Sequence, residues 1–153
     1  MTALQQIENW FSAKKWKAFP FQKQTWNAYL SGKDGMLNAP TGSGKTYAMG
    51  LGILAEYLEN QDSKDHQTGI QAIWITPIRA LAKEIEFSLS TACAELDIPW
   101  DVAKRTGDTS ASERAKQKKK LPQILITTPE SLQLLLASKG YQQQFKGLKC
   151  IVN

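Results

Sequence analysis

The feature that most constrains the fold of this chain is a glycine-rich loop within the stretch LNAPTGSGKTYAMG, residues 37–50. A short apolar run precedes the loop, and a Lys-Thr pair and an apolar-striped helix follow it. In the P-loop pattern, this order wraps backbone N–H groups around phosphates, while the lysine reaches the β and γ phosphates and the threonine ligates Mg²⁺. We therefore predict a nucleotide and Mg²⁺ site formed by Thr41, Gly42, Ser43, Gly44, Lys45 and Thr46, with Lys45 and Thr46 as catalytic residues and Thr46 as the metal ligand.

The loop departs from the P-loop pattern at one position, because Ala39 stands where the first glycine is usual. An alanine is acceptable there if that position keeps a negative φ. Gly42 and Gly44 can supply positive φ values and a close backbone approach, and a helix from about Lys45 to Asn60 would add the positive end of its dipole. A glycine turn that binds nothing would not explain the Lys-Thr pair between a strand and a helix, so we favour nucleotide binding.

Gln22 indicates which base the nucleotide carries. It lies 23 residues before Lys45, in the segment FPFQKQTW. A glutamine amide offers a donor and an acceptor in one plane, so it can pair with adenine N6 and N7 and reject guanine, whose O6 is an acceptor. This selects ATP. The neighbouring Trp16, Phe19 and Phe21 could stack on the base, but we expect them to pack the helix onto the sheet instead.

Helical and strand patterns alternate along the chain and predict an α/β fold. The order favours a doubly wound, mostly parallel sheet with helices on both faces, which binds ligands at the carboxyl ends of its strands. Pro77 and Pro129 fall where first helical positions are expected, and Ser110 and Glu113 have capping-box spacing. Helices are expected at about 4–13, 22–30, 45–60, from 78 onward, 110–119 and 129–138, and strands at 36–38, 70–76, 98–106, 123–127 and 148–153.

Composition is that of one globular domain, with 42% hydrophobic and 22% charged residues in 153. No segment approaches the roughly 20 apolar residues needed to cross a bilayer, and no basic and apolar leader begins the chain. We therefore expect a cytoplasmic protein without a membrane contact. Cys93 and Cys150 lack partners at metal-ligand spacing and are expected to be reduced and inert, and His66 receives no catalytic role.

The net charge of +5 is concentrated in residues 101–120, where seven basic and three acidic side chains leave +4. A basic patch suits a polyanion, but lysines near a helix C-terminus are also stabilising without any ligand. For the run KQKKK we favour the solvated helix end, and we leave Lys116–Lys120 out of the predicted site.

Five segments in order, FPFQKQTW, APTGSGKT, TPIRALAKEI, TGDTS and TTPESL, resemble the first half of a superfamily 2 DEAD/DEAH (DEXH) box helicase. Within that superfamily the chain is most similar to the Lhr type and to the bacterial ligase-associated helicases. The resemblance runs from about Trp16 to the final residue. It implies that residues 1–153 are the N-terminal part of the first RecA-like P-loop NTPase domain, preceded by a helical segment at about 1–31, and that a second RecA-like domain follows.

The resemblance also implies roles for single residues: Gln22 reads adenine, Lys45 holds the phosphates and Thr46 binds the metal. The residues implied to line a nucleic-acid track are Thr76, Pro77, Arg79, Thr106, Gly107, Thr128, Pro129 and Glu130. The sequence supports this set independently, because "TP" twice follows an apolar strand and opens a helix whose free N–H groups can hold phosphates. Arg79 can add a bidentate phosphate contact. Ordinary capping by the threonines is the alternative and is compatible with phosphate binding.

The final segment, LKCIVN, is expected to be a strand that the chain leaves unfinished, so we expect a truncated domain. In the helicase family this strand ends in an Asp-Glu pair that contacts the metal and activates water. Residues 1–153 alone are therefore expected to hydrolyse little or no ATP.

Taken together, these patterns predict an ATP-dependent helicase or translocase, with single-stranded or partly duplex DNA as partner and a role in DNA repair. The residues leave two alternative functions open. One is a P-loop kinase of small molecules, which would not explain Gln22 or the two "TP" helix starts. The other is an ATP-responsive switch that binds nucleic acid without unwinding it. DNA rather than RNA is chosen on the resemblance alone, because contacts to the 2′-OH decide that question.

Overall fold

The chain folds into two compact units. The computed structural model describes residues 1–40, 42–63 and 69–153. The first unit comprises Met1–Asp62 and Ala92–Ile98, and the second comprises Ser63–Thr91 and Pro99–Asn153. Among the described residues, no helix combines the length and the apolar character that crossing a membrane requires.

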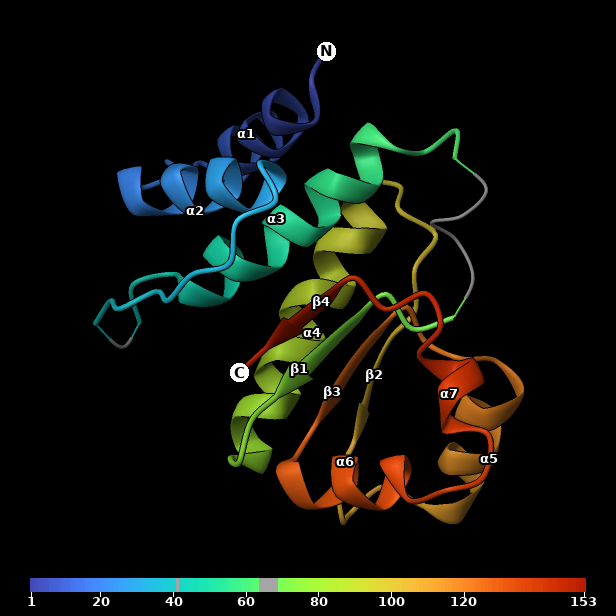
Figure 1. The fold of residues 1–153 in the computed structure, drawn as a ribbon. Helices are drawn as coiled ribbons and strands as arrows, with labels where there is room; N and C mark the ends of the chain where they lie inside the picture. The colour runs from blue at the N-terminus through green and yellow to red at the C-terminus, as the bar shows by residue number, and fades with distance from the viewer. Residues whose placement is uncertain (41, 64–68) are drawn as a thin grey trace. The chain divides into compact units, whose positions relative to one another are not determined.

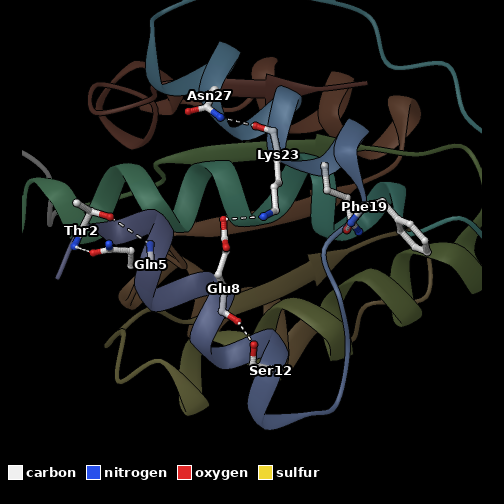
Figure 2. Close-up of polar contacts among 8 residues, drawn as sticks. Thr2, Gln5, Glu8, Ser12, Phe19, Lys23 and Asn27 are labelled. Carbon is white, nitrogen blue, oxygen red and sulfur yellow. Dashed lines mark hydrogen bonds and ion pairs between the residues drawn. The ribbon is translucent and has the colours of Figure 1, made fainter.

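Three helices dominate the first unit: α1 (Ala3–Ala13), α2 (Pro20–Leu30) and α3 (Lys45–Glu59). A capping box starts α1, in which the Thr2 hydroxyl accepts from the Gln5 amide at 3.2 Å and the Gln5 side chain accepts from the Thr2 amide at 2.9 Å (Figure 2). A salt bridge of 3.2 Å between Glu8 and Lys23 joins α1 to α2 (Figure 2). The expected first two helices therefore form, with bounds within two residues of the prediction.

The core of the first unit is aromatic. Phe11 and Trp26 are buried and meet edge to face, with ring centroids 5.7 Å apart. Phe11 also meets Tyr47 edge to face at 5.9 Å, and Trp26 Nε1 donates to the Tyr47 carbonyl at 3.0 Å. Edge-to-face pairs of this kind stabilise a core beyond the area they bury. Helices α1 and α2 thus both pack against the first turn of α3, and this turn directly follows the glycine-rich loop.

The aromatic residues before α2 behave differently from one another. Trp16 lies against Phe11 of α1 and Tyr47 of α3, with centroid distances of 5.8 and 5.6 Å, but it is 44% exposed and these neighbours belong to helices, not to the sheet. Phe19 stacks on Phe21 with an interplanar angle of 8°, yet its side chain is 54% exposed. Phe19 therefore does not serve as a core residue.

The last turn of α4 (Arg79–Glu95) contributes to the first unit through Glu95. Its carboxylate accepts from Trp10 Nε1 at 2.6 Å and lies 2.8 Å from Lys14 Nζ. The hydrogen bond from Lys14, and after it that from Trp10, lowers the pKa of Glu95. Lys14 Nζ also lies 5.1 Å above the centre of the Trp10 ring, a cation–π distance.

Cys93 is expected to resist thiol reagents in the native protein. It is buried on α4, and that burial raises the pKa of its thiol to about 12, so almost no thiolate forms at mildly alkaline pH. Cys150 is half-buried and should react first. Mass-spectrometric mapping of N-ethylmaleimide adducts tests this, with labelling in urea as the control for both thiols. Equal native labelling rates for the two cysteines would contradict the expectation.

The second unit is built on a four-stranded parallel sheet in the order β2-β3-β1-β4 (Figure 1). This confirms the predicted α/β fold with a parallel sheet. The strands are β1 (Ala72–Ile75), β2 (Val102–Arg105), β3 (Ile124–Thr127) and β4 (Cys150–Val152), and the helices besides α4 are α5 (Ala111–Lys119), α6 (Pro129–Leu136) and α7 (Tyr141–Gln144).

Both faces of this sheet are buried. Ile73 and Leu125 lie on one face and pack with Leu135 of α6. Because successive strand side chains point to opposite faces, Trp74 and Ile126 lie on the other face, and they are buried as well. Burial on both sides explains why the strands are nearly continuous apolar runs rather than alternating ones.

The structure differs from the sequence prediction at three places. Residues 36–38 form no strand, and Met36 is 96% exposed. The stretch is short and is followed by Pro40, which has no N–H to donate to a ladder. Helix α4 begins at Arg79, two residues after Pro77, which was expected at the first helical position. Helix α7 was not expected, because four residues are too few to show an apolar period.

Candidate functional site

The glycine-rich loop has the backbone geometry that its sequence requires. Gly42 and Gly44 have φ values of +76° and +92°, which favour glycine. Gly44 is the N-cap of α3, and the first helical bond runs from the Ala48 amide to its carbonyl at 3.1 Å. No side chain of the described residues caps this helix start. The N–H groups of its first turn are therefore donors for an anion, and Lys45 and Thr46 are the first two helical residues.

Gln22 of α2 contacts this loop through its side chain. Its side chain is buried, its Oε1 accepts from the Phe19 amide at 2.8 Å, and its Nε2 donates to the Gly44 carbonyl at 3.1 Å. A Cβ added at Gly44 would lie 2.5 Å from Nε2. These two bonds use one donor hydrogen and one acceptor lone pair of the amide. Adenine recognition by Gln22 stays a prediction, and positioning of Gly44 is a role that sequence reasoning missed.

The turn before α3 is closed by Ser43, whose amide donates to the Pro40 carbonyl at 3.3 Å and whose hydroxyl bonds to the same oxygen. Lys45 and Thr46 are half-buried at the start of the helix. Thr41 and His66 lie outside the described residues. In the first unit, the structure therefore brings together Gln22 and the loop residues that were predicted to hold the nucleotide.

In the second unit, the three predicted track motifs follow three neighbouring strands at one level. Ile75 of β1 and Arg105 of β2 both pair with Thr127 of β3. The next residue after each strand is a threonine, and the three threonines are Thr76, Thr106 and Thr128. Parallel strands end at the same edge of a sheet, so these motifs form one row along the carboxyl edge, where open α/β sheets bind ligands.

The three threonines of this row are buried and shape its turns. Their hydroxyls accept from the amides of Ile78 at 3.3 Å, Asp108 at 3.2 Å and Ser131 at 3.3 Å, respectively. Only Thr128 is the N-cap of a helix, with Pro129 at the first helical position as expected. The other five residues of the predicted track are exposed: Pro77, Arg79, Gly107, Pro129 and Glu130.

Arg79 and Asp108 connect two of these motifs. Arg79 Nη1 lies 2.8 Å from Asp108 Oδ1, and the side chains are 59% and 71% exposed. A Cβ at Gly107 would lie 2.7 Å from Arg79 Nη2, so glycine is required for the guanidinium to lie where it does. Sequence reasoning did not single out Asp108, although an acidic residue between two motif residues of a basic segment is a signal that could have found it.

A second arginine supports the turn at Thr106. Arg114 of α5 donates from Nη2 to the Thr106 carbonyl at 3.2 Å. Burial lowers the pKa of Arg105, and repulsion from the nearby Arg114 lowers it further. The basic side chains in the last turn of α5, Lys116, Lys118 and Lys119, are exposed at a helix end, as the solvated interpretation requires.

Comparison with known proteins agrees with this arrangement. A sequence model of the DEAD/DEAH box helicase family matches residues 19–153. The ATP-dependent helicase Lhr-Core of Sulfolobus acidocaldarius is 37% identical over 154 residues, covering 96% of this chain and 18% of that protein. The chain therefore spans about a fifth of the length of that relative.

Solved structures give the same result. The helicase Lhr of Mycobacterium smegmatis bound to ssDNA and AMP-PNP has a TM-score of 0.69 and 29% identity, covering 94% of this chain and 19% of that one. The DUF1998 helicase MrfA bound to DNA and AMPPNP has a TM-score of 0.79 and 25% identity, covering 95% of this chain and 20% of that one. The predicted likeness to the Lhr type and the RecA-like fold are both confirmed.

Proposed function

Because the chain belongs to the DEAD/DEAH box helicase family, we propose that it is the ATP-binding part of an ATP-dependent DNA helicase or translocase. The observation that carries this proposal is the uncapped start of α3, which follows a glycine at positive φ and presents Lys45 and Thr46. Residues 1–153 then belong to the first RecA-like domain, and a second such domain of the same full-length chain completes the motor.

ATP with Mg²⁺ is the nucleotide form that suits the loop. The amides at the start of α3 and the Lys45 ammonium group would hold the phosphates, and the Thr46 hydroxyl would be this chain's ligand to the metal. Bound Mg²⁺ neutralises charge on the phosphates. The AMP-PNP in the Mycobacterium smegmatis Lhr structure supports an adenine nucleotide. Adenine recognition by Gln22, whose side chain donates to the Gly44 carbonyl, is part of the same proposal.

Single-stranded or partly duplex DNA is the proposed partner of the row at Thr76, Thr106 and Thr128. Helix starts and an exposed arginine hold backbone phosphates without reading bases, which suits a protein that moves along a strand. The ssDNA in the Lhr structure and the DNA in the MrfA structure support DNA as a partner. ATP binding would change the affinity for DNA, and by linkage DNA would change the affinity for ATP equally. A role in DNA repair in the cytoplasm is part of the same proposal.

Replacement of Lys45 tests the proposal in the full-length protein. We expect single-stranded DNA to stimulate the wild-type ATPase and Lys45→Ala to reduce the stimulated rate about 100-fold or more, because a charge aimed at the transferring phosphoryl group is lost. Lys33→Ala is the matched control, since Lys33 is exposed on the same unit and lies outside the loop. Titration calorimetry with Mg²⁺ and AMP-PNP should show loss of binding in the first variant only.

Other outcomes would favour the alternatives. A wild-type ATPase that single-stranded DNA does not stimulate would favour a small-molecule kinase. ATP-dependent DNA affinity without strand separation would favour the binding switch. Robust ATP hydrolysis by residues 1–153 alone would contradict the expectation that the Asp-Glu pair of the family is needed.

A further inference from the structure

Arg79 lies where a cation is unfavourable for its own helix. It is the first residue of α4, and the N-terminus of a helix carries a partial positive charge that disfavours Arg and Lys. The residue is also 59% exposed at its side chain, so it does not pack in a core. A helix start with an arginine is a site for an anion, and in this structure the anion is the Asp108 carboxylate.

The Asp108 carboxylate occupies the guanidinium by a single contact, between Oδ1 and Nη1 at 2.8 Å. Its backbone is held in place, because the Asp108 amide donates to the buried Thr106 hydroxyl at 3.2 Å. Gly107 lets the guanidinium lie close to this turn. A backbone phosphate that binds Arg79 through Nη1 would therefore have to displace this carboxylate.

We propose that Asp108 sets the nucleic-acid affinity of this edge by holding Arg79 until a backbone phosphate displaces the carboxylate. The proposal rests on the proposed function, since it takes Arg79 to be a phosphate contact. Displacement is feasible because both side chains are largely exposed, and surface ion pairs of this kind are weak. A phosphate also binds a guanidinium bidentately, whereas the carboxylate contact uses Nη1 only among the described atoms.

Removal of the Asp108 charge should therefore tighten binding. In the full-length protein, we expect Asp108→Asn to lower the dissociation constant for a fluorescein-labelled oligothymidylate about two- to fivefold, the range that corresponds to loss of a competing surface ion pair. Arg79→Gln should weaken binding about tenfold and reduce the slope of log affinity against log salt by about one. Fluorescence anisotropy at several salt concentrations measures both effects.

The matched control is Asp101→Asn. Asp101 also forms an exposed ion pair in the second unit, with Lys120 at 3.0 Å, and its loss changes the net charge by the same amount. We expect this variant to bind as the wild type does. A double variant tests the route of the effect, since Asp108→Asn should change affinity little once Arg79 is glutamine. Thermal unfolding of each variant checks that the fold is kept.

Three results would overturn the proposal: Asp108→Asn weakens binding, it tightens binding no more than Asp101→Asn does, or it gives the same gain in the Arg79→Gln background. The first would mean that Asp108 prepares Arg79 for phosphate instead of competing with it. If Arg79→Gln weakens binding while Asp108→Asn has no effect, this inference fails and the proposed function stands. If neither the wild type nor any variant binds the oligothymidylate, this inference and the proposed function are both wrong.

Discussion

Replacing Gly44 with alanine is expected to abolish measurable Mg²⁺-ATP binding by the full-length protein. The new Cβ would lie 2.5 Å from Gln22 Nε2, a distance that real contacts do not show, and a φ of +92° is strained for any residue with a Cβ. The strain alone costs about 1–2 kcal/mol, and the contact forces either the loop or Gln22 to move. Titration calorimetry with Mg²⁺ and AMP-PNP measures the loss, and thermal unfolding reports the accompanying destabilisation.

Gly42→Ala is the matched control for this prediction. Its φ is +76°, but no described heavy atom lies within 4 Å of the added Cβ, so the variant carries backbone strain without a clash. We expect a smaller loss of nucleotide affinity than for Gly44→Ala. Equal losses in the two glycine variants would show that the Gln22 contact is unimportant.

Truncation of Trp26 is expected to destabilise the first unit by about 3–5 kcal/mol, the usual cost of removing a buried tryptophan ring. Trp26 is 1% exposed, meets Phe11 edge to face and donates to the Tyr47 carbonyl at 3.0 Å. Because Tyr47 lies one residue after Thr46, we expect Trp26→Ala also to loosen the start of α3. Urea unfolding followed by circular dichroism measures the stability, and calorimetry with AMP-PNP measures the functional effect.

Two further variants make this prediction specific. Trp26→Phe keeps an aromatic ring and removes the N–H donor, so it should cost only about 1 kcal/mol. Phe87→Ala removes a ring that is 74% exposed, and its effect should stay within about 0.5 kcal/mol. A loss in Trp26→Ala no larger than that in Phe87→Ala would refute the assigned role of the aromatic core.

The nucleotide loop and the parallel sheet could be predicted from the sequence because their signals are local. Gly42 and Gly44 were expected to supply positive φ, and both do. The apolar runs at 70–76 and 123–127 were long enough to predict buried strands, and the strands form within them as β1 and β3. The hydrophobic period and the conformation of a glycine depend on residues that are close in the sequence, so both can be predicted from a single amino-acid sequence.

The sequence alone also placed Thr76 and Thr106 at the ends of strands and Thr128 directly after one, but only the tertiary structure set them at one level. That alignment depends on the register of β1 and β2 against Thr127, which is a property of strand packing. Residues 36–38 form no strand for a related reason. A three-residue run has too little local preference for a strand, so its conformation depends on tertiary contacts.

By itself, the sequence therefore determined the glycine-rich loop, most of the order of helices and strands, and the family. Tertiary structure decided what the side chains of the site contact: Gln22 bonds to Gly44, and Arg79 pairs with Asp108, at separations of 22 and 29 residues. Such contacts form only when strand register and helix packing bring distant residues together. No local propensity encodes them, and for that reason the Gln22–Gly44 and Arg79–Asp108 contacts emerged only from the folded chain.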